Sequence, residues 1–290
     1  MNSQTFLVTG ATGNVGRPVA LGLAAKGHRV LAAARDRSRV AAQLGEPVSA
    51  VELDFLRPET FASAVQGVQG IFLMRPPALT KMGPTLNALI DAAVQAGVEQ
   101  VVFLSVIGAD QLRFIPHHAV EAHLQASPIS WTLLRAGFFA QNLGDAYAKD
   151  IRECDRILLP AGSGRAAFLD VRDLAEVAVQ ILTEPPTQGQ ALTLTGPEAL
   201  SFQQVAQELT AVLHRPIAYQ PVSPLHYLWH LRRQGLSFGQ SLVQTALHVG
   251  LRFGQAERVD PTLERLLDRP PRPLRTYIED HATLWQAQPL

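Results

Sequence analysis

Short apolar runs alternate with amphipathic segments over the first two thirds of the chain. The apolar runs predict β-strands at residues 5–9, 29–34, 48–53, 70–74, 100–106 and 131–134. Helices are predicted at about 15–25 and 83–96, where apolar residues of the second segment recur with the 3.6-residue period of a helix. Strands that alternate with helices need crossover connections, so we expect a parallel sheet with both faces covered.

The pattern changes after Thr195. Ser201 is typical of an N-cap and predicts a helix that ends at Leu213, and the chain beyond Pro221 is mostly helical between proline and glycine breaks. We therefore predict an α/β protein with a Rossmann-type, doubly wound parallel sheet and a smaller, mostly helical C-terminal domain. The expected boundaries are 1–195 for a dinucleotide-binding domain and 196–290 for a substrate-cleft domain, which can also take loops from 137–165.

A glycine-rich loop joins the first predicted strand to the first predicted helix. Residues 9–16 read TGATGNVG. In such a loop the first glycine permits a tight turn, the second lets the backbone approach a pyrophosphate, and the third lets the helix pack against the strand. The helix N-terminus then offers free N–H groups to the phosphates. An ordinary strand-to-helix turn is the alternative. We predict that the dinucleotide is contacted by Gly10, Thr12, Gly13, Asn14, Val15 and Gly16.

Five further segments, taken in order, narrow the family. They are VVFLSV (101–106), HHAVEAHLQAS (117–127), SWTLLRAGFFAQN (130–142), FLDVRDLAEVA (168–178) and LTGPEALSFQQVA (194–206). With the glycine loop, they resemble the NmrA-like family of atypical short-chain dehydrogenase/reductases. That family includes NAD(P)H:quinone reductases, ergot-alkaloid-type imine reductases and redox-sensing regulators.

The residues after the second predicted strand favour NADPH over NADH. An NAD-specific site usually places a carboxylate there for the ribose 2′-hydroxyl, whereas an NADP site places an arginine for the 2′-phosphate. Arg35 ends this strand; Asp36 follows it, and Arg37 and Arg39 make the local charge positive. The guanidinium fork suits a phosphate, and the resemblance also implies an arginine here. A solvated surface charge is the alternative for Arg35.

The resemblance implies further cofactor contacts beyond the strand ends. It assigns Asp54 and Phe55 to the adenine, and Met74, Arg75 and Pro76 to the path of the ribose and pyrophosphate. Arg75 departs from the small or hydroxyl residue expected at its position. For Phe55 and Met74, plain core packing is the alternative.

The Tyr-x-x-x-Lys pair of standard short-chain dehydrogenases is missing, because none of the four tyrosines has a lysine four positions on. The helix after the fifth strand instead carries His117 and Glu121 on one face. Reduction of a simple ketone needs a strong, positioned acid. A quinone or an iminium does not, so the sequence favours activated acceptors or no chemistry at all.

His117 is the candidate proton donor or ribose contact, and a helix-start histidine paired with Glu121 is the alternative. Ser105 ends the fifth strand, where a hydroxyl can face the nicotinamide or be satisfied locally. The resemblance places the segment after the sixth strand beside the nicotinamide, and aromatic rings there can stack on a flat acceptor. The predicted residues are Gly137 and Phe138 for the cofactor, and Phe139, Asn142 and, from the C-terminal domain, Tyr227 for the substrate.

Composition excludes several classes of protein. The chain has 25 basic and 25 acidic residues, which removes the electrostatic case for binding nucleic acid or a membrane surface. A single cysteine, Cys154, allows no intrachain disulfide, and neither it nor the histidines have metal-ligand spacing, so no metal is predicted. Without a visible secretory signal or a membrane-length apolar run, a cytoplasmic location is expected.

Two functions fit these observations. The first is an NADPH-dependent reductase that passes a hydride to a conjugated or aromatic small molecule such as a quinone or an imine. The second is an NADP(H)-sensing regulator without turnover. The glycine loop serves both; the missing Tyr/Lys pair favours the regulator, and a small C-terminal domain without a long extra segment favours the reductase. We prefer the reductase, and a homodimer stays open.

Overall fold

The computed structural model describes residues 3–187 and 189–286, which form two compact units. Unit 1 comprises the described parts of Met1–Ala136 and Val171–Leu194. Unit 2 comprises the described parts of Gly137–Asp170 and Thr195–Leu290. The chain therefore passes between the units at 136–137, 170–171 and 194–195.

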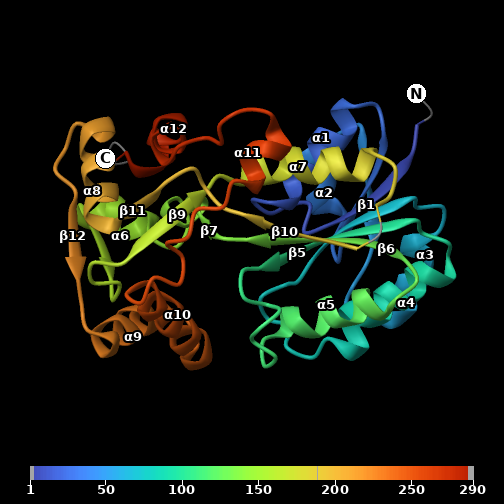
Figure 1. The fold of residues 1–290 in the computed structure, drawn as a ribbon, viewed down its shortest axis with the longest axis horizontal. Coiled ribbons are helices and arrows are strands. Elements are labelled where there is room, and N and C mark those ends of the chain that lie inside the picture. The colour runs from blue at the N-terminus through green and yellow to red at the C-terminus, as the bar shows by residue number, and fades with distance from the viewer. Residues whose placement is uncertain (1–2, 188, 287–290) are drawn as a thin grey trace. The chain divides into compact units, whose positions relative to one another are not determined.

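Unit 1 contains a seven-stranded sheet in the order β10-β6-β5-β4-β1-β2-β3 (Figure 1). Every neighbouring pair is parallel. This confirms the Rossmann-type sheet predicted from the alternating pattern. The strands are β1 (Thr5–Thr9), β2 (Arg29–Ala34), β3 (Val48–Glu52), β4 (Gly70–Met74), β5 (Gln100–Val106), β6 (Ser130–Ala136) and β10 (Gln190–Leu194).

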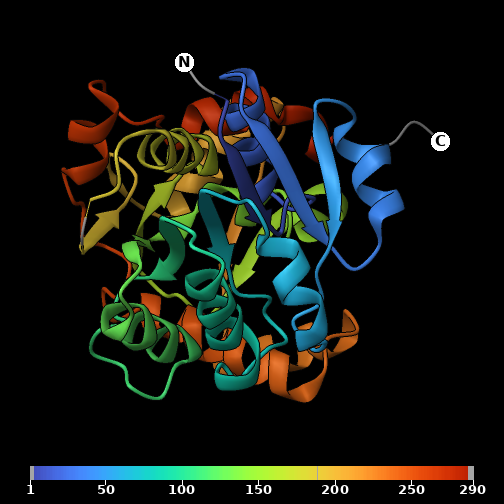
Figure 2. The same ribbon diagram turned by 90° about the vertical axis from the view of Figure 1, so that its right-hand side faces the viewer.

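Helices cover both faces of this sheet (Figures 1 and 2). One face carries α1 and α7, which pack together, and the other carries α3, α4 and α5. Alternate strand residues such as Leu7, Ile71 and Val101 are buried in one apolar cluster with side chains of α3, α4 and α5. The helices are α1 (Gly16–Ala25), α2 (Arg37–Leu44), a 3-10 turn (Pro58–Thr60), α3 (Phe61–Val65), a π-helical turn (Gly83–Asn87), α4 (Ala88–Gln95), α5 (Pro116–Ala126) and α7 (Val171–Thr183).

Unit 2 combines two small sheets with most of the C-terminal helices. The sheets have the orders β11-β9-β7 and β12-β8. The strands are β7 (Phe138–Phe139), β8 (Arg156–Leu159), β9 (Arg165–Leu169), β11 (Ala199–Ser201) and β12 (Ala218–Pro221). The helices are α6 (Ala148–Cys154), α8 (Phe202–Leu213), α9 (Pro224–Arg233), α10 (Phe238–Leu251), α11 (Thr262–Leu267) and α12 (Leu274–Asp280), with 3-10 turns at Ala140–Leu143 and Ala282–Trp285.

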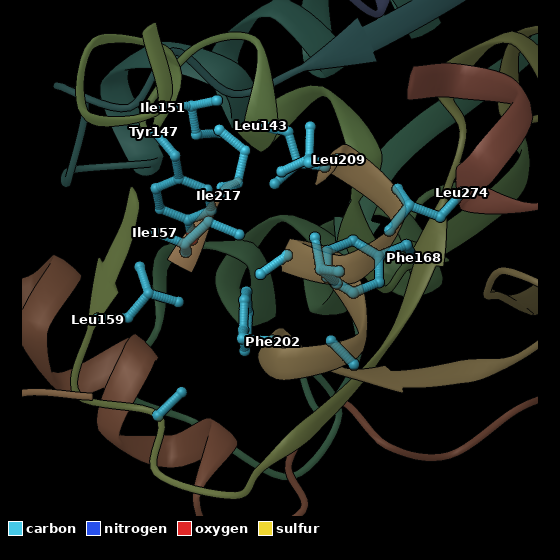
Figure 3. Close-up of a cluster of buried hydrophobic side chains, with 14 of the residues drawn as sticks. Leu143, Tyr147, Ile151, Ile157, Leu159, Phe168, Phe202, Leu209, Ile217 and Leu274 are labelled. Carbon is cyan, nitrogen blue, oxygen red and sulfur yellow. The ribbon is translucent and has the colours of Figure 1, made fainter. Parts of the chain in front are cut away.

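Unit 2 has an apolar core of its own (Figure 3). Phe168 of β9, Phe202 and Leu209 of α8 and Leu143 are among its fully or almost fully buried members. Trp285 is completely buried and donates its indole N–H to the carbonyl of Leu143 at 2.9 Å. As predicted, Ser201 caps α8, and Gln204 completes a reciprocal capping box.

Within the described residues, no helix is both long and apolar enough to cross a membrane. No cluster of three or more His, Cys, Asp or Glu side chains in 3–187 and 189–286 is arranged to hold a metal ion.

Candidate functional site

The strand order places a crevice beside β1. Strands are added on one side of β1 through β2 and β3, and on the other side through β4, β5 and β6. In doubly wound sheets, ligands bind at this switch point beyond the carboxyl ends of the strands. Thr9 links β1 to β4 at this point. Its hydroxyl donates to the Phe72 carbonyl at 3.1 Å and accepts from the Met74 N–H at 2.8 Å.

Two glycines of the loop are required by the protein's own atoms. Gly10 has a φ of +63°, and a Cβ at this position would also collide with the Sδ atom of Met74. A Cβ at Gly16 would collide with the carbonyl group of Gly10, because the first turn of α1 lies directly against the loop. The tight turn and the close packing expected of these two glycines are therefore visible in the backbone.

Gly13 is different, because the protein barely restricts this position. Its N–H donates to the Gly10 carbonyl at 2.9 Å, and a Cβ would meet only that carbonyl oxygen, at 3.3 Å. Val15 provides no side-chain cap for α1, and the first turn contains no acidic residue. The helix N-terminus thus keeps its partial positive charge without an internal anion. These features fit a diphosphate beside Gly13.

A cavity of about 610 Å³ opens next to this loop within unit 1. It brings together six residues predicted for the cofactor, namely Gly10, Thr12, Arg35, Asp54, Phe55 and Pro76. The lining also contains Asp36 and Arg39, which the sequence analysis named as charges beside Arg35, and five residues that it missed, which are Ala33, Ala34, Leu56, Ala78 and Leu79. Gly13, Asn14, Val15, Gly16, Met74 and Arg75 neighbour this lining in the sequence and are not part of it.

The charged groups of the cavity differ in what they already bind. Asp36 caps α2 and accepts hydrogen bonds from the N–H and hydroxyl of Ser38, which lower the pKa of its carboxyl group. Asp54 accepts from the Leu56 N–H at 3.0 Å. Arg35, in contrast, has no hydrogen bond or ion pair with any described residue. The lining thus carries two arginines, Arg35 and Arg39, and two carboxylates, Asp36 and Asp54, and among these Arg35 is a cationic group without a partner among the described residues.

Ser105 lies at the end of β5 and is fully buried. Its hydroxyl donates to Glu121, which is only 2% exposed. Glu121 also receives two hydrogen bonds from Arg135, at 3.1 and 2.6 Å, and Arg135 pairs with Asp110. The partners of Glu121 are thus Ser105 and Arg135, and no bond joins it to His117 within the described residues.

His117 occupies the first turn of α5 and is mostly buried. Burial, with a smaller contribution from the nearby charge of Arg75, lowers the pKa of His117 to about 4. Its ring lies 6.1 Å from that of Phe103, measured between centroids. His117 is therefore a neutral imidazole near pH 7, which can give or accept a hydrogen bond and does not carry a proton to donate as an imidazolium. The neighbouring His118 contacts the Ala109 carbonyl through Nδ1 at 2.8 Å.

The remaining predicted residues belong to unit 2. Gly137 precedes β7; Phe139 and Asn142 are partly buried in the segment that follows. Phe138 packs edge-on against Phe168 at a centroid distance of 5.4 Å. A larger aromatic set joins Phe138 to Tyr227 through His248, at 6.3 and 5.2 Å.

Tyr227 and His248 are both buried parts of this aromatic set. Tyr227 is 2% exposed, and burial raises the pKa of its phenol. His248 contacts the Gln244 carbonyl through Nδ1 and the Tyr147 hydroxyl through Nε2. With the proton on Nδ1, Tyr147 donates to His248, and the pair is satisfied internally. The buried Tyr227 ring favours packing over substrate contact.

The chain matches a known protein family. A profile of the NmrA-like family matches residues 2–269. The chain belongs to the NmrA-like family. The resemblance inferred from the glycine loop and the five segments is thereby confirmed.

Enzymes stand among the relatives of this NmrA-like chain. It is 31% identical to the NAD(P)H azoreductase of Xenophilus azovorans over 293 residues, covering 97% of this chain and 99% of the relative. It is 28% identical to quinone oxidoreductase 2 of Escherichia coli, covering 91% and 93%. The crystal structure of the NADPH-dependent quinone oxidoreductase QOR2 from Escherichia coli in complex with NADPH superimposes with a TM-score of 0.85 at 26% identity, covering 95% and 99%.

Proposed function

We propose that this chain is an NADPH-dependent reductase that transfers a hydride to an activated acceptor such as a quinone, an azo compound or an imine. The observation that carries the proposal is the cavity in unit 1, which joins the glycine loop to an arginine with no partner among the described residues. Relatives named as NAD(P)H azoreductase and quinone oxidoreductase support the reaction class.

The residues of unit 1 fit the cofactor part by part. The open space beside Gly13 and the uncapped N-terminus of α1 suit the diphosphate. Arg35, with Arg39 beside it, suits the 2′-phosphate, because Asp36 and Asp54 already hold their own turns. Phe55 and Asp54 line the space that the adenine would take. We infer from this charge distribution that NADPH is preferred over NADH.

The chain's own groups set which acceptors are suitable. When bound, NADPH supplies a hydride, which is one proton together with two electrons. A quinone then needs one further proton, which solvent can deliver to the stabilised phenolate. The buried, neutral His117 and the Ser105 hydroxyl held by Glu121 do not form a strong acid. The protein's contribution is therefore to bind and orient the two reactants, and simple ketones are not expected as substrates.

Steady-state turnover with a panel of acceptors tests this proposal. NADPH oxidation is followed with quinones, azo dyes and imines, and with simple ketones as a negative set. Gly13→Asp introduces a carboxylate where the diphosphate would lie, at a position where a Cβ comes within 3.3 Å of the Gly10 carbonyl oxygen and of no other atom within 4 Å. Like-charge contact costs several kcal/mol, so binding should weaken by about a hundredfold or more.

Gly239→Asp is the matched control, since it adds the same charge at an exposed helix position with nothing near its Cβ. Turnover that survives Gly239→Asp and is lost in Gly13→Asp supports the reductase. Tight NADPH binding without turnover across the panel would instead indicate a cofactor sensor, and absence of NADPH binding by calorimetry would refute both.

A further inference from the structure

Arg75 follows β4 and turns its side chain back onto its own loop. One guanidinium nitrogen, Nη1, lies within hydrogen-bond distance of the carbonyl oxygens of Pro76, Pro77 and Leu79, at 3.1, 3.0 and 2.7 Å, so its two N–H groups are shared among three acceptors. Three acceptors within four residues surround a single cationic group. Hydrogen bonds to a charged donor are about twice as strong as neutral ones, so this contact dominates the local interactions of the loop.

Apart from this contact, Leu79 packs against the apolar cluster of unit 1, and the backbone of the loop contributes little. Pro76 and Pro77 have no N–H, and among the described residues the only backbone hydrogen bond of the segment 76–79 runs from the Leu79 N–H to the Pro76 carbonyl, at 3.0 Å. The segment has no helix or strand structure. Three of its residues, Pro76, Ala78 and Leu79, line the cavity beside the glycine loop. Arg75 therefore fixes a wall of the cavity without being part of its lining.

The side chain of Arg75 lies in an energetically unfavourable environment. Arg75 is half-buried, its Nε lies buried without a hydrogen-bond partner among the described residues, and burial lowers the pKa of its guanidinium. A buried donor without a partner destabilises the folded state. The three carbonyl contacts offset the free-energy cost of desolvating the Arg75 guanidinium.

We propose that Arg75 is a positioning residue: it clamps residues 76–79 into the shape that receives the cofactor, and it does not itself bind the diphosphate. Its effect on catalysis rests on the proposed function, whereas its effect on the loop does not. The competing role is direct contact between the guanidinium and the cofactor phosphates. The two roles differ in the protein without cofactor, where only a clamp has an effect.

Hydrogen exchange of the protein without cofactor separates them. Arg75→Met keeps the length of the side chain and removes the charge and the donors. We expect the amide of Leu79, whose N–H donates to the Pro76 carbonyl, to exchange roughly tenfold faster than in the wild type, because local opening is no longer opposed. Arg29→Met, at the exposed amino end of β2, is the matched control and should leave this rate unchanged. Equal rates in Arg75→Met and the wild type would overturn the clamp.

Steady-state kinetics provide the second readout. With a clamp, Arg75→Met raises the KM for NADPH and for NADH by the same factor, about tenfold, and changes kcat at saturation by less than about twofold. Arg75→Lys, which keeps a cation with N–H donors, should recover part of the loss. A raised KM with unchanged exchange in the cofactor-free protein would assign Arg75 to the phosphates instead.

The two proposals fail in different ways. If the wild type neither binds nor oxidises NADPH, the proposed function is wrong, and the exchange rates still decide whether Arg75 holds the loop. If the wild type turns over and Arg75→Met matches it in both exchange and KM, the clamp is wrong and the reductase stands.

Discussion

Arg35 and Asp36 are adjacent, exposed and opposite in charge, and they differ in what they already bind. Asp36 uses its carboxylate to cap α2 through Ser38, whereas Arg35 has no partner among the described residues. A local turn therefore occupies one oxygen of the carboxylate that NADH would need, which supports the cofactor preference that we propose.

Arg35→Ala tests this preference at the level of one side chain. Charge-assisted hydrogen bonds contribute about 1.5–3 kcal/mol each. We expect the KM for NADPH to rise by roughly ten- to a hundredfold and the KM for NADH to change little, so the ratio of kcat/KM values shifts toward NADH. Arg29→Ala, at the opposite end of β2, should leave the ratio unchanged. Equal losses with both cofactors would show that Arg35 does not recognise the 2′-phosphate.

Single site residues are best predicted from the sequence at positions that only one residue type can occupy. Gly10 and Gly16 were predictable because a positive φ and a close backbone contact leave glycine no substitute. The partners of Glu121 were not predictable. Helical spacing shows which residues share a face of the helix, and it does not show which strands supply their hydrogen-bond partners. Ser105 and Arg135 come from β5 and β6, and only the folded sheet brings both to Glu121.

Glu121 also connects a helix of unit 1 to two strands of its sheet. Glu121 of α5 accepts from Ser105 of β5 and from Arg135 of β6, while all but 2% of its surface is buried. A buried ion pair is costly to break from one side, because the remaining charge stays desolvated. Arg135 keeps a second partner in Asp110, which moderates that cost.

Glu121→Gln measures the strength of this tie between elements. We expect the free energy of unfolding of unit 1 to fall by about 3 kcal/mol, the lower end of the range for a broken buried pair. Glu99→Gln is the control, because it removes the same charge from an exposed position; it should change stability by less than about 0.5 kcal/mol. The measurement is urea unfolding at neutral pH. A loss in Glu121→Gln as small as in Glu99→Gln would contradict the assigned role.

Elements with strong periodicity were predicted, and those stabilised by context were missed. Strands β1, β2, β4 and β5 begin and end at the predicted residues, since each is a continuous apolar run. β10 was not predicted: its first two residues are exposed, as suits an edge strand, and its pairing with β6 is non-local. The helix predicted at 83–96 has a π-helical turn before α4, a detail that hydrophobic spacing does not distinguish.

Over the whole molecule, each unit closes around its own apolar core. The change of pattern at Thr195 is visible in the sequence because strands give way to helices. The earlier crossing at 136–137 is marked less sharply, because β6 runs almost directly into β7, and the sequence indicated it only through loops from 137–165 that the C-terminal domain can take. Pairing of β9 with both β7 and β11 assigns these residues to unit 2, and such contacts between distant segments leave no local signal.

Unit 1 carries the partly buried His117 and unit 2 the buried His248, and burial favours the neutral form of each. Burial lowers the pKa of His117 in unit 1 to about 4, and burial also lowers the pKa of His248 in unit 2. Between about pH 6.5 and the lowered value, the unfolded chain binds a proton that the folded chain does not. Stability therefore falls as the pH falls through this window, and it is unaffected by these groups above it.

His117→Gln tests this linkage across the molecule. The difference between 6.5 and about 4 corresponds to at most about 3 kcal/mol lost by the wild type on acidification. Urea unfolding is measured from about pH 7.5 down to about pH 4. The glutamine variant should lose less stability over this range, because it has no imidazole to protonate. His226→Gln removes an exposed ring and should follow the wild-type curve. If His117→Gln also follows that curve, His117 is not held neutral by the fold, and a titration of its imidazole by NMR would then show an ordinary pKa.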